Sequence, residues 1–482
     1  MKNLNVKEII TVTNAELVQG DLNLLCKNFS KDTRIIKPGD TYIAIKGENF
    51  NGNLFWKDAL EKGAKCIIIS EMNFKKEELE KYKDRTILKV EDTLQALYEI
   101  AKLKRSFYKV PVIAITGSVG KTSTKDIVAN VVSQKYKTLK TIGNNNNNIG
   151  LPFTILRMQD EEAMVLEMGM NHFGEISLLS DIAKPDICII TNIGTSHIGN
   201  LGSRENILKA KLEILEGTKN PKVIINNDND LLNKWAKENQ NNYNIITYGI
   251  KEKSKIQANN IELKEFGSNF KCEIDGKNIE IEVPIGGIHF VLNALAAISV
   301  GKVLELETDK IVKGVETFEL TKKRMDIEKL KNEITIINDT YNASLESMKA
   351  SLEYLSKLKN NRKIAVLGDM LELGEYSRQL HEKVGKTVYE NKIDLLFCSG
   401  ENAKYIAQEA QKKGMQKEKI YYFENKEEIP KKLKEISKKD DAILFKASNG
   451  MKFFELIEQL KNLYWSISAV WFKKGVFMLW KK

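Results

Sequence analysis

The chain has 482 residues, of which 42% are hydrophobic and 29% charged, a balance typical of folded globular proteins and not of disordered ones. This length is too great for one compact core and predicts about three domains. The net charge of +10 is spread along the chain, so it suits a nucleotide as well as a nucleic acid and excludes neither.

Five widely spaced cysteines form no CxxC pair, which argues against a zinc site and against a disulfide framework. Cys66 and Cys188 lie in apolar runs and are expected to be buried thiols of strands. The first ten residues lack the apolar stretch of a signal peptide. We therefore expect a protein of the reducing cytoplasm.

Residues 1–108 are expected to form a smaller N-terminal α/β domain. The runs TYIAIKG (41–47) and KCIIIS (65–70) predict strands, and the segment between them predicts a helix that ends at Gly63.

Residues 109–318 and 319–461 predict two further domains in which strands alternate with helices. Such alternation is typical of the α/β class, with parallel sheets covered by helices. The expected strands of the central domain are 111–117, 163–169, 185–194 and 222–227. Those of the Rossmann-like C-terminal domain are 334–341, 363–370, 393–400 and 441–448.

The strongest chemical signal is TGSVGKTST (116–124), which follows a strand and opens a helix. Glycines let backbone N–H groups face phosphates, the helix start adds positive potential, Lys121 can reach the terminal phosphates, and Thr122 can ligate Mg²⁺. Ile115 stands where the strict GxxxxGK[ST] pattern has its first glycine. A glycine-containing turn without function is the alternative, and GKT makes a phosphate loop the favoured interpretation.

Glu167 and His197 follow the next two strands and are candidates for a second divalent metal. Mg²⁺ prefers oxygen ligands, so a histidine would be an unusual choice. Taken alone, each is more simply a structural residue, and only the phosphate loop upstream favours a metal.

Four motifs resemble the Mur ligases, ATP-dependent amide-bond ligases of peptidoglycan precursor synthesis: GSVGKTST (117–124), GNNNNNIGLP (143–152), LEMGMNHFGEI (166–176) and TNIGTSH (191–197). Three further runs are most similar to the branch that adds D-alanyl-D-alanine to UDP-N-acetylmuramoyl-tripeptide. They are DTR (32–34) followed by residues 38–52, DTYNA (339–343) and LGDMLELG (367–374). The resemblance covers about residues 25–460. It implies a central P-loop ATPase domain between an N-terminal domain that binds the UDP substrate and a C-terminal domain.

The resemblance also implies ATP and two Mg²⁺ ions as ligands, held by residues of all three blocks. The implied ATP-binding residues are Gly117, Ser118, Val119, Gly120, Lys121, Thr122, Ser123, His289, Asn293, Arg324 and Asp339. The implied metal ligands are Thr122, Glu167, His197 and Lys211, and the implied catalytic residues are Lys121, Lys211, His197 and Arg324. Lys211 matches a lysine that is often carbamylated in the family; by spacing alone it is a charged residue on an amphipathic helix.

For the UDP substrate, the resemblance implies a set of mostly polar residues from two domains: Ser30, Asp32, Thr33, Arg34, Lys46, Gly47, Asn49, Asn144, Asn146 and Asn147. Two departures fall on the acceptor side. Ser344-Leu345 replaces the family's Asn-Pro, and Asn449 replaces an arginine, so a bidentate contact to a carboxylate is lost there. Lys446 remains a candidate for that contact.

The implied reaction phosphorylates the tripeptide carboxylate with ATP, and the dipeptide amine then displaces phosphate from the acyl phosphate. No residue is identifiable as the base that deprotonates the amine.

Two alternative functions remain. One is a sibling ligase or a folylpolyglutamate synthase. The other is a nucleotide-dependent switch that has lost ligation, and Asn449 in place of the family's arginine is the reason to keep it. We expect a monomer that does not bind nucleic acid.

The tail 462–482 lies beyond the resemblance and combines aromatic residues with lysine pairs. Its longest stretch without charged residues is shorter than the about 20 apolar residues of a membrane-spanning helix. We favour a tail that folds back on the third domain or has no function, and a weak contact with the membrane surface is the second alternative.

Overall fold

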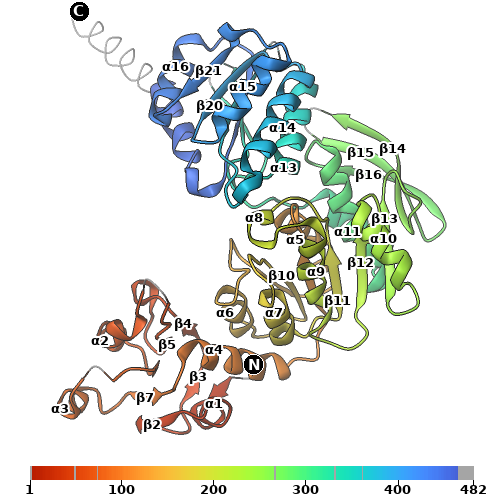
Figure 1. Ribbon diagram of the computed structural model, residues 1–482. Helices are drawn as coiled ribbons and strands as arrows, with labels where there is room; N and C mark the ends of the chain where they lie inside the picture. The colour runs from red at the N-terminus through yellow and green to blue at the C-terminus, as the bar shows by residue number, and fades with distance from the viewer. Residues whose placement is uncertain are drawn as a thin grey trace, which may run out of the picture.

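The computed structural model describes residues 3–47, 50–72, 74–264, 267–330, 333–360 and 362–464. Asn49 and most of the tail prediction, residues 465–482, lie outside the described residues. Figure 1 shows three lobes in chain order, each with its own sheet, and the central lobe lies between the other two. The protein is thus of the α/β class, as predicted.

The N-terminal lobe is a five-stranded sheet in the order β2-β7-β6-β5-β4, in which only β2 is antiparallel to its neighbour. Its strands are β2 (Glu16–Gln19), β4 (Phe29–Ser30), β5 (Thr41–Ile43), β6 (Cys66–Ile69) and β7 (Thr86–Lys89), and β1 (Leu4–Asn5) pairs separately with β3 (Leu25–Cys26). Its helices are α1 (Val6–Thr13), α2 (Trp56–Glu61), α3 (Lys76–Leu79) and α4 (Thr93–Ser106). Alternate residues of β6 enter two separate apolar clusters, so helices cover both faces.

The central lobe has a nine-stranded sheet in the order β16-β15-β14-β13-β12-β11-β8-β10-β9. Its strands are β8 (Val112–Thr116), β9 (Thr138–Lys140), β10 (Ala163–Glu167), β11 (Ile187–Ile190), β12 (Lys222–Asn226), β13 (Asn244–Gly249), β14 (Ile256–Lys264), β15 (Gly267–Ile274) and β16 (Lys277–Val283). The four predicted strands are present as β8, β10, β11 and β12. The antiparallel extension β14-β15-β16 was not predicted.

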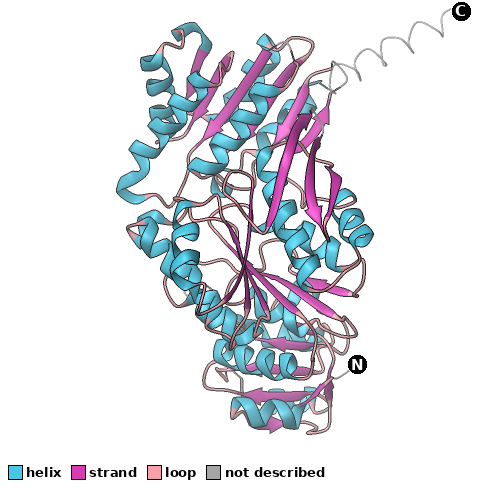
Figure 2. Cartoon of the chain, turned by 90° about the vertical axis from the view of Figure 1, so that its right-hand side faces the viewer, coloured by secondary structure: helices cyan, strands magenta, loops and turns pink. Residues whose placement is uncertain are grey.

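Helices lie on both sides of the central sheet (Figure 2). They are α5 (Lys121–Val132), α6 (Gly150–Leu156), α7 (Glu175–Ala183), α8 (Ile198–Leu201), α9 (Arg204–Leu212), α10 (Asp230–Asn239), α11 (Ile288–Val303) and α12 (Thr308–Glu316). α5, α11 and α12 pack on one another, whereas α6 and α7 pack against α4 of the N-terminal lobe. Because β8, β10 and β11 are neighbouring parallel strands, the loops after them meet at one edge of the sheet.

The C-terminal lobe has a six-stranded sheet in the order β17-β18-β22-β19-β20-β21, with β17 antiparallel and the rest parallel. Its strands are β17 (Asp326–Lys329), β18 (Thr335–Asn338), β19 (Arg362–Gly368), β20 (Leu395–Ser399), β21 (Ile420–Phe423) and β22 (Asp441–Lys446). Its helices include α13 (Leu345–Lys357), α14 (Ser377–Glu390), α15 (Ala403–Lys413) and α16 (Ile429–Ile436). All four strands predicted for this block are present.

All five cysteines are buried free thiols, and the predicted strand positions of Cys66 and Cys188 are confirmed. Among the helices of the described residues, none combines the length and the apolar character that crossing a bilayer requires.

Candidate active site

The loop between β8 and α5 has the shape of a phosphate-binding loop. Gly117 has φ 148°, and a Cβ there would lie 1.9 Å from Thr191 Oγ1, so only glycine fits. The Lys121 ammonium donates to the Gly117 carbonyl oxygen at 2.8 Å. Asn192 holds the loop from β11's side, because its amide accepts from the Val119 N–H at 3.0 Å and donates to the Val119 carbonyl at 2.9 Å. Since α5 begins at Lys121, the helix start faces this loop.

A hydrogen-bonded network joins the phosphate loop to the end of β10 and to the C-terminal lobe. The Thr122 hydroxyl donates to Glu167 Oε2 at 2.8 Å, and Asn146 Nδ2 donates to Glu167 Oε1 at 2.7 Å. Arg324 Nη2 donates to Thr122 Oγ1 at 2.8 Å, and its guanidinium carbon lies 3.9 Å above the ring centre of Tyr341. Arg324 Nε is buried without a hydrogen-bond partner among the described residues. A buried, unpaired guanidinium donor beside a phosphate loop fits a phosphate oxygen.

Lys211 and His197 lie within electrostatic range of Lys121. The side chain of Lys211 is 1% exposed, and no hydrogen bond or ion pair within the described part of the chain engages its ammonium. Burial holds the pKa of Lys211 well below its ordinary value, and the charge of Lys121 lowers it further. Burial also lowers the pKa of His197, and the charges of Lys121 and Lys211 add to this effect, while Glu372 opposes it. His197 Nδ1 lies 2.8 Å from Glu372 Oε2 of the C-terminal lobe.

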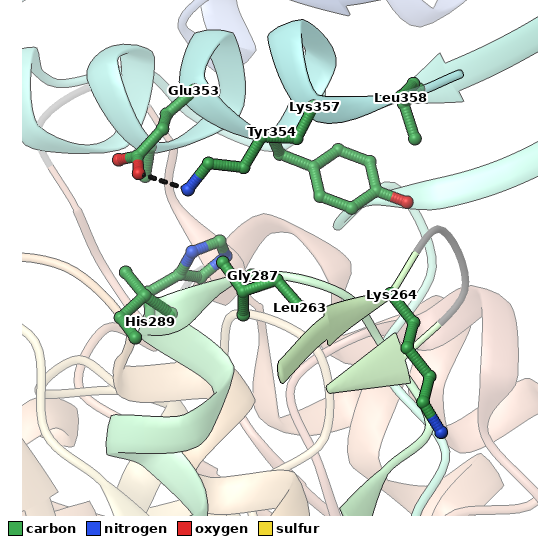
Figure 3. A pocket seen from close by; sticks show the side chains of 10 residues that line it. Leu263, Lys264, Gly287, His289, Glu353, Tyr354, Lys357 and Leu358 are labelled. Carbon is green, nitrogen blue, oxygen red and sulfur yellow. Dashed lines mark hydrogen bonds and ion pairs between the residues drawn. The ribbon is translucent and has the colours of Figure 1, made fainter. Parts of the chain in front are cut away.

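Two residues at the start of α11, His289 and Asn293, were predicted to bind ATP, and they lie in different surroundings. Asn293 Oδ1 accepts from the Thr124 hydroxyl at 3.1 Å, beside Gly120 of the phosphate loop. His289 lines a pocket between α11 and α13, where Figure 3 shows its ring across from the Glu353–Lys357 ion pair. Burial lowers the pKa of His289 to about 4, so its ring is neutral at pH 7. A neutral ring in a half-open pocket can hydrogen-bond or stack on an aromatic base.

Asp339 is bonded within the C-terminal lobe. Its Oδ2 accepts from the Ser351 hydroxyl at 2.7 Å and from the Lys446 ammonium, which also donates to the Asn342 carbonyl oxygen at 3.2 Å. Lys446 is only 2% exposed, so it does not present its charge to a substrate in this arrangement. Asn449 lies exposed after β22.

The N-terminal residues predicted for the UDP substrate form two groups. Ser30, at the end of β4, exchanges hydrogen bonds with the backbone of Asp32, whose carboxylate binds the Arg34 guanidinium at 2.6 Å. Arg34 is exposed, and Thr33 is buried. Lys46 pairs with Glu71 at 2.7 Å, and Gly47 N–H donates to the Phe50 carbonyl oxygen at 2.8 Å.

The predicted asparagines of the central lobe lie in the loop before α6, which packs close to β4. Asn144 is exposed, and Asn147 Oδ1 caps the helix start through the Gly150 N–H at 2.8 Å. Asn146 turns instead to Glu167, as described above. The next residue, Asn148, donates to the Tyr98 hydroxyl of α4 at 3.1 Å and so joins the two lobes.

Sequence reasoning missed three residues of this region. Asn192 clamps the phosphate loop, and Glu372 faces His197. Glu346, in the first turn of α13, accepts from the Thr195 N–H at 2.9 Å and from its hydroxyl at 3.2 Å. Asn192 and Glu372 belong to the runs 191–197 and 367–374 that carried the family resemblance, which was the available signal. The contact of Glu346 with Thr195 joins segments with no local pattern.

Comparison with known proteins gives matches in all three lobes. The Mur ligase family, catalytic domain, matches residues 28–105; the Mur ligase middle domain matches 115–301; and the Mur ligase, glutamate ligase domain, matches 323–449. UDP-N-acetylmuramoyl-tripeptide–D-alanyl-D-alanine ligase of Bacillus subtilis (strain 168) is 38% identical over 460 residues, which cover 93% of this chain and 98% of the relative.

Solved structures agree with this match over nearly the whole length. A crystal structure of MurF from Acinetobacter baumannii has a TM-score of 0.86 at 28% identity and covers 96% of this chain and 99% of that one. MurF ligase from Thermotoga maritima in complex with ADP has a TM-score of 0.79 at 29% identity and covers 90% of this chain and 97% of that one.

Proposed function

The chain belongs to the Mur ligase family, and on that premise we propose that it joins D-alanyl-D-alanine to UDP-N-acetylmuramoyl-tripeptide in peptidoglycan precursor synthesis, with ATP converted to ADP and phosphate. The observation that carries the proposal is the similarity to a ligase of that name over 98% of the relative's length, so that all three lobes are matched. A relative solved with ADP supports ATP as the nucleotide.

The chemistry explains why a phosphate loop and an arginine from a second lobe are needed. A carboxylate is a poor electrophile, so the tripeptide carboxylate takes the γ-phosphoryl group of ATP and ADP leaves. The amine of D-alanyl-D-alanine attacks the resulting acyl phosphate, and phosphate and a proton are released as the amide forms. Phosphoryl transfer depends on positioning and on neutralising charge, and Lys121 and Arg324 are the cationic side chains at the loop.

The residues present fit Mg²⁺ through oxygen donors. The Thr122 hydroxyl and the Glu167 carboxylate lie 2.8 Å apart beside the loop, and both are ligand types that Mg²⁺ accepts. When bound there, Mg²⁺ would neutralise the charge of the phosphates. Within the described residues no group of three or more His, Cys, Asp or Glu side chains gathers as a ready metal site. The expected ligands of a second Mg²⁺ are Glu167 and His197, and a modified Lys211 would add an oxygen ligand there.

We propose that Lys211 is carbamylated in the active protein. Burial lowers the pKa of Lys211, which favours its neutral amine, and a neutral amine adds to CO₂ to give a carbamate and one proton. The carbamate would place an anion within range of the Lys121 charge. It would also add an oxygen ligand to the second metal site.

The remaining expectations belong to the same proposal. Ser30, Asp32, Thr33, Arg34, Lys46, Gly47, Asn49, Asn144, Asn146 and Asn147 would hold the UDP substrate. Five buried free thiols support a reducing compartment, which suits a reaction in the cytoplasm. The expected oligomeric state is a monomer.

The test is a phosphate-release assay with ATP, Mg²⁺, UDP-N-acetylmuramoyl-tripeptide and D-alanyl-D-alanine. We expect phosphate release that requires both peptide substrates, and mass spectrometry should detect the pentapeptide product. Release with a single amino acid in place of the dipeptide would assign the chain to a sibling activity. Nucleotide binding without any ligation would show a switch protein and overturn the proposal.

A further inference from the structure

Arg324 reaches the phosphate loop from the segment that joins the central and C-terminal lobes. This linker, residues 317–325, runs between α12 and β17. On its C-terminal side the backbone is tied to that lobe, because the Met325 N–H donates to Asp339 Oδ1 at 3.3 Å and the Tyr341 N–H donates to the Lys323 carbonyl oxygen at 3.2 Å. The position of Arg324 relative to the phosphates therefore depends on what ties the linker to the central lobe.

Two residues of α5 supply such ties: Asn130 Nδ2 donates to the Thr317 hydroxyl at 3.1 Å at the start of the linker, and nearer to Arg324 the tie is Asp126, which is 2% exposed. Its Oδ2 accepts two hydrogen bonds from one linker residue, from the Thr321 N–H at 3.0 Å and from the Thr321 hydroxyl at 2.8 Å. Its Oδ1 lies 2.9 Å from the Lys125 ammonium and 3.4 Å from that of Lys140, so both oxygens are engaged. α5 begins with Lys121 and Thr122, so this carboxylate sits on the same rigid helix as the phosphate-binding groups.

The backbone on either side of Arg324 needs such a tie. Lys323 has φ 66° and Met325 has φ 49°, and residues other than glycine adopt this left-handed region only at a cost in free energy. Strained conformations persist where the surroundings over-determine them. Arg324 itself is held by its bond to Thr122 and by stacking on Tyr341, while its Nε has no partner among the described residues.

We propose that Asp126 is a positioning residue of the ligase site, which acts through Thr321 to hold Arg324 against Thr122 and the phosphates. This inference rests on the proposed function, since it takes Arg324 as the group that neutralises phosphate charge. The competing interpretation is that Asp126 only stabilises the packing of α5 against the linker.

Asp126→Asn keeps the size of the side chain and removes its charge. We expect kcat to fall about tenfold, because a charge-assisted hydrogen bond is lost, while the KM for ATP changes less than about twofold. Thr321→Val removes only the hydroxyl donor and should lower kcat less than Asp126→Asn does. Thr321→Ser keeps the hydroxyl and should have the kcat of the wild type. The matched control is Asp441→Asn, which removes an equally buried carboxylate that binds Arg362 at 2.7 Å in the C-terminal lobe. It should lower the melting temperature and leave kcat unchanged.

A double-mutant cycle with Arg324→Ala separates positioning from stability. If Asp126 acts through Arg324, adding Asp126→Asn to Arg324→Ala causes no further loss of kcat; independent, multiplicative losses would overturn the proposal. So would an Asp126→Asn variant that melts earlier but keeps its kcat.

Hydrogen exchange tests the tie without using activity. The Thr321 amide should exchange faster in Asp126→Asn than in wild type, and unchanged exchange would overturn the proposal. Should the wild-type protein fail to ligate its proposed substrates, the proposed function fails, and exchange still decides whether Asp126 orders the linker.

Discussion

Replacing Lys211 by methionine should stabilise the protein and inactivate it. The side chain of Lys211 is 1% exposed and its amine has no partner among the described residues, so folding removes the side chain from most of its contact with water without a compensating bond. Burying an unsatisfied polar group costs about 1–3 kcal/mol, and methionine has a similar shape without that cost. For a domain of this size, each kcal/mol shifts the melting temperature by about 2–4 °C.

The pH dependence of this gain has a definite sign. The pKa of Lys211 in the folded protein lies below its value in the unfolded chain. Between the two values the unfolded chain binds more protons, so the free energy of unfolding rises with pH in that window. The stability advantage of Lys211→Met should therefore shrink as the pH rises from 7 towards the ordinary lysine value of about 10.4, and above it only the cost of burying the neutral amine should remain.

The assay is thermal unfolding in buffer purged of CO₂, from pH 7 to pH 10.5, together with kcat in the presence of bicarbonate. Lys209→Met on the same helix is the control, because Lys209 is exposed and should change neither quantity. Lys211→Ala should regain part of its activity with added short-chain carboxylic acids, which would restore an anionic oxygen. A Lys211→Met protein that is fully active, or that is less stable at pH 7 than wild type, would refute the reasoning.

Three further predictions concern the nucleotide and the lobes. Lys121→Ala should lower kcat/KM by at least about 10³-fold if its charge acts in the transition state, and a loss below about threefold in steady-state kinetics would remove it from the mechanism. Glu167→Gln keeps an acceptor for Thr122 but loses the anion, so the Mg²⁺ concentration for half-maximal activity should rise, and an unchanged Mg²⁺ titration would exclude Glu167 as a ligand. Because the proposed substrates contact all three lobes, X-ray scattering should show a smaller radius of gyration with a non-hydrolysable ATP analogue plus UDP-tripeptide than without ligands; an unchanged radius would contradict closure.

The parallel strands could be predicted because each is a short apolar run buried on both faces. β8, β10, β11 and β22 are buried at every position, and each is hydrophobic except at its end residues. The hairpin strands β14 to β16 were missed because one face carries polar residues, as in KNIEIEV of β16. Their alternation was visible in the sequence, but it is a weaker signal between longer helical patterns.

The phosphate loop was predictable because the residues that form it are consecutive in the sequence. The burial of Lys211 was not, because nothing in LKAKLEI distinguishes it from the exposed Lys209 two positions away. The bond from Arg324 to Thr122 joins residues 202 positions apart, and only the family resemblance suggested it. Local patterns specify local geometry, whereas the charge environment of this site is assembled from three strand ends and a second lobe.

The two lobes around the phosphate loop are coupled through the segment that follows β11. This segment carries His197 and also receives the C-terminal lobe, since Glu346 binds Thr195, Glu372 lies 2.8 Å from His197, and the Tyr376 hydroxyl donates to the Gly202 carbonyl oxygen at 2.8 Å. Any ligand that changes the position of His197 must therefore also change the free energy of docking of that lobe. By the same linkage, a change in docking alters the affinity of the site for that ligand. Arg324 lies at the same boundary, because it donates to Thr122 of the central lobe and stacks on Tyr341 of the C-terminal lobe, so its position depends on the docking of both lobes.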